Sequence, residues 1–293
     1  MLLENYRIIK NIHKQFNISY FKLILSYLLK KNINTTLFNK KISISLSRLL
    51  QISRLLENNW KILSLSQEYI KLKYIDNTII TCRLKRGYDL GHLVEIFLDN
   101  IYGDNFDGKN IIDIGMSNAD SSIYFAKHGA KYVVGLEPDK QSFDLALRNI
   151  NDSGVNKKVL PLNKALSKSR KNIEFFVYYN NPNANSISKK NMVKINNDGI
   201  YKERVGSITL KEVINKFKYK GKGKKVNLLK MDCEGCEYDV LENLDSDSYS
   251  KIDAIILEYH NGLQKLPNIL KKNGFKLEIF ENTDKMGYIK AKK

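Results

Sequence analysis

The stretch Asn110-Ile-Ile-Asp-Ile-Gly115 decides the fold. Its apolar run ends in an aspartate and a glycine, which is the pattern of a strand buried in a parallel sheet and followed by a tight turn. The glycine permits a close approach of the backbone to a bound molecule. Because such sheets bind ligands at the carboxyl ends of their strands, Asp113 and Gly115 are predicted to line a binding site.

Strands and helices alternate from this stretch towards the C-terminus. Apolar runs predict strands over residues 132–137, 159–163, 173–179, 226–232 and 252–258. Helical spacing predicts helices over residues 121–128, 140–151, 237–244 and 263–273. A pair of strands is expected at 275–280 and 287–290, and a polar loop at 180–198. This alternation predicts an α/β, Rossmann-like domain over residues 109–293, with a mostly parallel sheet covered by helices on both faces.

Two further regions precede this domain. Residues 67–85 alternate around Asp76-Asn77, which predicts a β-hairpin, and residues 92–102 have helical spacing, so residues 67–108 lead into the core. Residues 1–66 are predicted to form a helical extension, because leucine and isoleucine recur there at helical spacing.

The N-terminal region is also strongly basic. The chain has 49 Lys and Arg against 31 Asp and Glu, a net charge of +18, and residues 1–75 hold 13 of the bases but only 3 acids, a net of +10. This excess predicts an anionic partner for residues 1–75, which is nucleic acid, an acidic membrane surface or a phosphorylated carrier. A lysine-rich composition without a binding role remains open, with the apolar stripes packed on the neighbouring domain.

The cysteine and hydropathy patterns bear on location. The chain has three cysteines, Cys82, Cys233 and Cys236, and so small and odd a number predicts no disulfide framework. We expect packed thiols in a cytoplasmic protein, with peripheral attachment to a membrane as an alternative. The apolar segment 20–29 is too short to span a bilayer, which needs about 20 residues.

An acidic residue also follows the second predicted strand. Glu137-Pro138 comes 24 residues after Asp113, and an acid at that place can accept hydrogen bonds from both hydroxyls of a ribose. The Gly-x-Gly-x-x-Gly that admits a pyrophosphate is absent, since Met116-Ser-Asn-Ala119 follows the first glycine. S-adenosylmethionine lacks phosphate and carries positive charge, so it is the predicted cofactor.

Two later strands end in ionisable residues at the same predicted edge of the sheet. Asp232-Cys-Glu234-Gly235 follows one strand, and His260 follows the next. Transfer of a methyl group to a hydroxyl needs a base. His260 is the first candidate, because the ordinary pKa of imidazole is about 6.5, and Glu234 is the second. A surface role for His260, and a helix-terminus role for Asp232, remain open. No metal is predicted.

These residues together resemble the FkbM-type methyltransferases, which are S-adenosylmethionine-dependent and have the class I, Rossmann-like fold. The resemblance covers about residues 83–280, and the Asp-x-Glu-Gly-x-Glu stretch is its most specific part. The matching stretches are 113–126, 135–138, 163–167, 207–210, 229–237 and 256–260.

The resemblance implies roles for particular residues. Asp113 and Gly115 would line the methionine end of the cofactor, and Glu137 and Pro138 its ribose. Ala165 would lie near the adenine, and Asp232 and Glu234 would face the methyl group and the substrate. The family often has Ala-Asn-x-Gly where this chain has residues 116–119. Ser117 keeps a hydrogen-bonding group there, and an inactive family member stays an alternative.

The predicted function is therefore an S-adenosylmethionine-dependent methyltransferase that O-methylates a sugar, a glycan precursor or another small hydroxylated molecule. One alternative is a non-catalytic ligand-binding module docked by its basic N-terminus. Another is an RNA methyltransferase anchored by residues 1–75, although the Pro-Pro turn expected of amino-methylating nucleic-acid enzymes is absent. The pattern predicts no particular oligomeric state.

Overall fold

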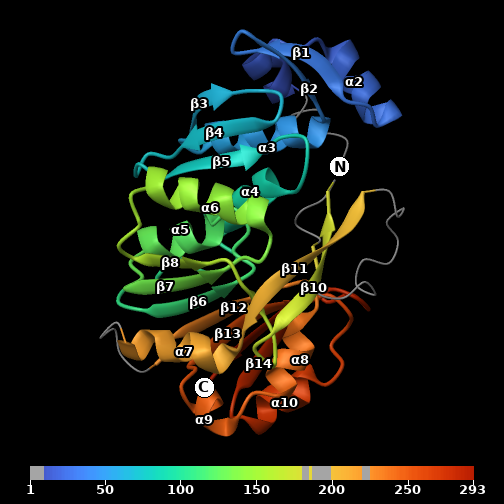
Figure 1. The fold of residues 1–293 in the computed structure, drawn as a ribbon. Coiled ribbons are helices and arrows are strands. Elements are labelled where there is room, and N and C mark those ends of the chain that lie inside the picture. The colour runs from blue at the N-terminus through green and yellow to red at the C-terminus, as the bar shows by residue number, and fades with distance from the viewer. Residues whose placement is uncertain (1–9, 180–184, 187–198, 220–224) are drawn as a thin grey trace. The chain divides into compact units, whose positions relative to one another are not determined.

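The computed structural model describes residues 10–179, 185–186, 199–219 and 225–293. The chain forms two compact units, Met1–Ile101 and Tyr102–Lys293 (Figure 1). The loop predicted at 180–198 lies outside the described residues, apart from Asn185 and Ser186.

The second unit is built around a seven-stranded sheet. Its strands lie in the order β14 (Lys276–Phe280), β15 (Gly287–Lys292), β13 (Ala254–Tyr259), β12 (Leu228–Met231), β6 (Asn110–Ile114), β7 (Tyr132–Leu136) and β8 (Val159–Leu162). Neighbouring strands from β13 to β8 are parallel, whereas β15 runs antiparallel to both of its neighbours. The chain builds outwards from β6 to β8 and then returns to β12. The switch point of this topology, where ligands bind in such sheets, therefore lies between β6 and β12.

Helices cover both faces of this sheet (Figure 1). On one face lie α5 (Asp120–Lys127) and α6 (Lys140–Asp152), and on the other lie α7 (Leu210–Tyr219), α8 (Cys236–Glu242) and α10 (Leu266–Lys272). The short helix α9 (Ser246–Ser250) precedes β13. The predicted Rossmann-like fold, that of class I methyltransferases, is confirmed.

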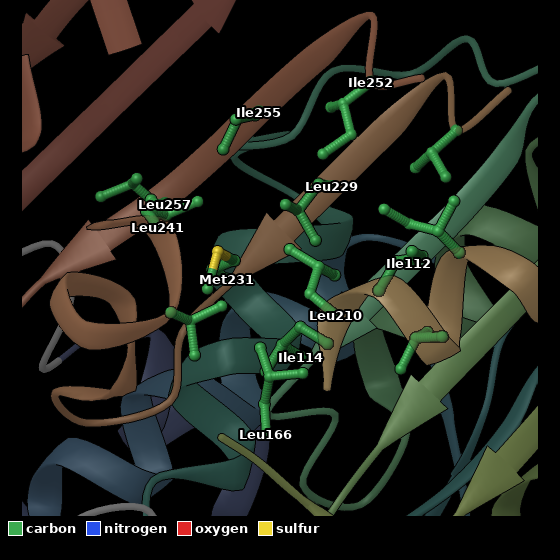
Figure 2. Packing of buried hydrophobic residues seen from close by; sticks show 14 of the residues in the cluster. Ile112, Ile114, Leu166, Leu210, Leu229, Met231, Leu241, Ile252, Ile255 and Leu257 are labelled. Atoms are coloured by element: carbon green, nitrogen blue, oxygen red, sulfur yellow. The ribbon is translucent and has the colours of Figure 1, made fainter. Parts of the chain in front are cut away.

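Alternate side chains of the central strands β6 and β12 face opposite sides of the sheet. Ile112 and Ile114 of β6 pack with Leu229 and Met231 of β12 in the apolar core beneath α7, α8 and α10 (Figure 2). Successive residues of a strand point to opposite faces. Asp113 and Lys230 are therefore directed to the other face, and the register places them opposite each other.

The second unit also contains a smaller, three-stranded sheet. β10 (Asn172–Tyr178) pairs antiparallel with β11 (Ile200–Ile208), and β11 pairs in parallel with β9 (Ala165–Leu166). Neither β11 nor α7 was predicted, because charged residues interrupt both apolar patterns.

The first unit contains more strand than the sequence predicts. The expected hairpin is confirmed as β4 (Tyr69–Lys73) and β5 (Ile79–Arg83), and β3 (Lys61–Leu65) extends it to a three-stranded sheet. The helices of this unit are 10–16, α2 (Tyr20–Leu29), α3 (Leu46–Glu57) and α4 (Asp89–Phe97).

The prediction of a wholly helical segment over residues 1–66 is wrong. A hairpin of β1 (Ile33–Leu37) and β2 (Lys40–Ile44) separates α2 from α3. Its turn residues Phe38 and Asn39 both have positive φ, 49° and 62°, as the favoured two-residue hairpin turn requires. The alternation of this segment is short, and helical spacing occurs on both sides of it.

Within the described part of the chain, no helix is both long and apolar enough to cross a membrane.

Candidate active site

The loop after β6 approaches the loop after β12 so closely that a side chain would not fit between them. Gly115 has a φ of +75°, and a Cβ built on it would lie 1.8 Å from the carbonyl oxygen of Asp232. Ser117 and Ala119 also have positive φ, 46° and 69°. Such backbone is costly outside glycine, and it is a feature of binding and catalytic loops.

Asp113 is fully buried beneath this loop. Its Oδ2 accepts hydrogen bonds from the hydroxyls of Ser121 at 2.7 Å and Ser122 at 2.6 Å, both in the first turn of α5. Its Oδ1 lies 3.2 Å from Nζ of Lys230. Asp113 thus ties β6 to α5 and β12, and it supports the Gly115 turn from below.

Lys230 joins the two loops and was not predicted to belong to the site. Its ammonium donates to the carbonyl of Gly115 at 2.8 Å and lies 3.8 Å from a carboxylate oxygen of Asp232. Burial by itself would lower the pKa of Lys230, but the charges of Asp113 and Asp232 outweigh burial and hold the pKa above its ordinary value. A lysine inside a buried apolar strand was the available signal.

Glu137 meets the same loop from the end of β7. Its Oε2 accepts the backbone N–H of Ser117 at 3.0 Å, and its Oε1 accepts that of Asp139 at 2.8 Å. Each carboxylate oxygen can accept more than one hydrogen bond, so a ribose hydroxyl can still bind. The backbone carbonyl of Pro138 accepts from the Asn163 amide at 3.0 Å. The predicted residues Gly115, Ser117 and Glu137 are thus brought together.

Ala165 occupies a different element. It lies buried in β9 and pairs with Ser207 of β11. The structure shows no contact that tests its expected place beside an adenine.

The loop after β12 contains a disulfide. Cys233 and Cys236 form a disulfide, with their Cα atoms 5.5 Å apart, so the prediction of packed thiols is wrong for this pair. The chain turns into α8 within three residues, which brings the two sulfurs within bonding reach. Glu234 between them has a φ of +54°, and its carbonyl accepts a hydrogen bond from the Ser186 hydroxyl at 2.6 Å.

His260, in the loop after β13, stands at the centre of four carboxylates. Its Nε2 lies 3.7 Å from Asp232, 3.6 Å from Glu234 and 3.8 Å from Glu258. Its Nδ1 lies 3.6 Å from Glu237. The imidazole is only 7% exposed, so the surface alternative for His260 does not hold. We call Asp232, Glu234, Glu237, Glu258 and His260 the His260 cluster.

The cluster retains protons at neutral pH. Burial by itself would lower the pKa of His260, but the carboxylates of Glu237 and Glu234 raise it to about 10. Burial raises the pKa of Glu234 to about 8, with the charge of His260 opposing the shift and neighbouring carboxylates adding to it. The ordinary imidazole pKa that favoured His260 as a base is therefore absent. A protonated His260 instead forms ion pairs with the surrounding carboxylates, at 3.6–3.8 Å.

Tyr102 is a further member of this region that was not predicted. Burial raises the pKa of its hydroxyl well above the ordinary value, and the charges of Asp232 and Asp113 add to the effect. Tyr102 precedes β6 in the sequence and does not follow a strand, so no sequence pattern indicated that it belongs to this region.

A metal ion would have to compete with the proton on His260. Among the described residues, the ligand atoms of Asp232, Glu258 and His260 lie within 4.8 Å of one another, which is a spacing that a metal can bridge. An imidazole must lose its proton to bind a metal, and a pKa of about 10 opposes that loss. The absence of a metal stays a prediction.

Replacement of Gly115 by alanine tests the contact between the two loops. We expect Gly115→Ala to lower the free energy of unfolding by more than about 3 kcal/mol, because the methyl group meets backbone as well as an unfavourable φ. Gly154→Ala is the matched control, since Gly154 has a φ of +68° but open space around its Cβ position. It should cost about 1 kcal/mol. The measurement is urea denaturation. If the two variants lost the same free energy of unfolding, the Gly115 and Asp232 loops would be able to move apart.

The raised pKa values predict a pH-dependent stability. His260, with its pKa raised from 6.5 to about 10, and Glu234, raised from 4.5 to about 8, hold more protons in the folded chain than in the unfolded chain. Their contribution is fully present at low pH and is lost as pH rises through these folded values. The contribution of Glu234 therefore declines from about pH 4.5 to about pH 8, and that of His260 from about pH 6.5 to about pH 10. The free energy of unfolding should fall most steeply where the two ranges overlap, between about pH 6.5 and about pH 8, and less steeply in His260→Gln. The measurement is urea unfolding of the wild type and of His260→Gln at a series of pH values. An equal change in the free energy of unfolding with pH in both proteins would contradict the prediction.

Comparisons with known proteins place this architecture in a family. Residues 110–277, more than half of the chain, match the family model of the methyltransferase FkbM domain. A search of curated proteins finds no match to the chain.

A search of solved structures finds several that match part of this chain at low identity. The methyltransferase FkbM from Methylobacillus flagellatus has a TM-score of 0.45 and 14% identity, covering 71% of this chain and 48% of that one, so this chain spans about half its length. TrmK from M. capricolum, in complex with S-adenosylhomocysteine, has a TM-score of 0.39 and 12% identity over 71% of this chain and 69% of that one. An O-methyltransferase from Bacillus cereus, also in complex with S-adenosylhomocysteine, has a TM-score of 0.36 and 12% identity over 63% and 74%.

The sequence motifs, the strand order and the family model agree on one family. Its members use the predicted cofactor, S-adenosylmethionine. The chain belongs to the FkbM family of S-adenosylmethionine-dependent methyltransferases.

Proposed function

We propose that the protein transfers the methyl group of S-adenosylmethionine to a hydroxyl of a sugar, a glycan precursor or another small hydroxylated molecule. One observation carries the proposal: the Gly115 loop touches the Asp232 loop at the switch point of the sheet. Ser117 and Glu137 adjoin the first loop, and the His260 cluster adjoins the second. A nucleoside-type site and a proton-accepting site are thus contiguous.

The residues of the first loop suit the cofactor. Glu137 would accept the ribose hydroxyls, and Gly115 and Ser117 would let the methionine end approach the backbone. Asp113 would act indirectly, because its carboxylate is occupied by Ser121, Ser122 and Lys230. When bound, the cofactor supplies an electrophilic methyl group on a positively charged sulfur.

The charge of the His260 cluster also suits a cation. Four carboxylates surround a single imidazole, so even a protonated His260 leaves the group negative. Buried negative charge needs a proton or a positive partner. A sulfonium placed beside Asp232 would be attracted to the cluster.

The chain's own task in catalysis is alignment and removal of one proton. The acceptor oxygen must lose its proton as it bonds to the methyl carbon, while the electron pair of the breaking carbon–sulfur bond stays on sulfur. Asp232 and the ionised form of Glu234 are the proposed proton acceptors, and the charge of protonated His260 attracts both. Holding the oxygen in line with the carbon–sulfur bond would account for much of the acceleration.

Calorimetry with S-adenosylmethionine tests the cofactor site. We expect the wild-type protein to bind, and Glu137→Ala to bind at least about tenfold more weakly, equivalent to about 1.4 kcal/mol. Asp144→Ala is the control, because Asp144 is an exposed acid of α6 that pairs with Lys140. It should bind like the wild type. A wild-type protein that does not bind the cofactor would overturn the proposal.

Transfer of a labelled methyl group tests the acceptor. Incubation with hydroxylated sugars, glycan precursors and RNA should label a sugar or glycan, and Glu234→Gln should reduce kcat by about a hundredfold or more. The cofactor affinity of this variant should change far less than its kcat. Cofactor binding without transfer to any acceptor would support the ligand-binding alternative, and labelled RNA would support the RNA methyltransferase.

A further inference from the structure

Helix α2 of the first unit exposes an apolar surface. Only Leu23 and Ser26 of its ten residues are buried. Phe21 is 74% exposed and Leu28 is 68% exposed. The exposed large apolar residues of the helix, which we call the α2 face, are Tyr20, Phe21, Ile24, Leu25, Tyr27, Leu28 and Leu29.

The geometry of a helix makes this surface continuous. At about 100° per residue, positions 20, 21, 24, 25, 28 and 29 fall within one half of the circumference, and the buried positions 23 and 26 lie on the other half. The only charged side chain of the helix, Lys22, falls next to the edge of the apolar half. Contiguous apolar patches of this kind mark sites of interaction rather than ordinary surface.

The sequence on either side of α2 is positively charged. Residues 5–56 contain ten Lys and Arg and no Asp or Glu. Lys30 and Lys31 follow the helix directly and are exposed, as is Lys22 within it. An apolar helical face flanked by lysines is the pattern of helices that lie in the interface of a negatively charged membrane.

A polar hollow next to the helix strengthens this assignment. It has a volume of about 440 Å³, and Lys22 of α2 and Lys41 of β2 both line it, together with Thr35, Thr36 and Ser43. Lysine, threonine and serine side chains carry donors that suit a phosphate. The hollow thus offers a place for a lipid headgroup beside the helix that would enter the acyl region.

We propose that α2 docks this protein on a membrane surface that contains anionic phospholipid. The α2 face enters the boundary between headgroups and acyl chains, which interfacial helices reach to a depth of about 5–10 Å. Lys22 and Lys41 bind lipid phosphate, and Lys30 and Lys31 bind the charged surface. Ten helical residues extend about 15 Å, so the helix lies in the plane of the interface and does not cross it.

Charge and side-chain type disfavour the two other occupants. In a two-fold dimer through the α2 face, the lysines of one copy would lie near those of the other, and residues 5–56 carry no acid to offset them. Nucleic acid is bound mainly through its phosphates and through stacking on aromatic groups. It leaves the leucine and isoleucine side chains of α2 without a partner.

The test is flotation of the full-length protein with vesicles. The probes are vesicles of phosphatidylcholine alone and vesicles in which a quarter of the lipid is phosphatidylglycerol. We expect binding to the anionic vesicles, weakened by added salt, and at least tenfold weaker binding to the neutral ones. Phe21→Ser with Leu28→Ser should reduce anionic-vesicle binding at least tenfold.

Two controls separate docking from folding and from catalysis. Ile75→Ser removes an apolar side chain that is 71% exposed but lies outside α2, and it should leave vesicle binding unchanged. The double α2 variant should keep the wild-type affinity for S-adenosylmethionine, so loss of docking is distinguished from failure of the methyltransferase proposal. Failure of the wild type to bind anionic vesicles would overturn the inference. So would dimerisation abolished by the double variant, or salt-sensitive RNA binding in place of vesicle binding.

Discussion

The buried pairing of Lys230 with Asp113 is the interaction on which the rest of the site depends. The two residues lie opposite each other on the strands that flank the switch point of the sheet. Asp113 anchors the first turn of α5, while Lys230 binds the carbonyl of Gly115 and neutralises part of the charge near Asp232. Removing one partner would leave the other charged and buried, at a cost of about 3–5 kcal/mol. The Gly115 loop and the Asp232 loop therefore share one electrostatic support.

The central sheet could be predicted because its strands are buried on both faces and therefore appear as continuous apolar runs. Ile111 and Ile112 of β6 illustrate this. The turn positions Gly115 and Glu137 followed from the ends of those runs. The hairpin at 33–44 could not be predicted in the same way, because its alternation is short and lies between two helical segments. Fold prediction thus succeeded where a local pattern and burial coincide.

The chemistry of the site was less predictable, because it depends on contacts between residues far apart in the sequence. Of the acids around His260, only Glu258 lies close to it in the sequence. The protonation of His260 comes from Glu234 and Glu237, which reach it from the preceding strand–helix connection. The role of Lys230 likewise depends on Asp113, more than a hundred residues earlier. Only the folded chain brings these charges within a few ångströms.

The Cys233–Cys236 disulfide has a consequence for selectivity among nucleophiles. Thiolates are stronger nucleophiles than hydroxyls, and a thiolate beside a sulfonium could take the methyl group intended for another molecule. Sulfur held in a disulfide has no thiolate to offer. In the proposed reaction, bonding the two cysteines to each other therefore removes competing acceptors from the loop that carries Glu234.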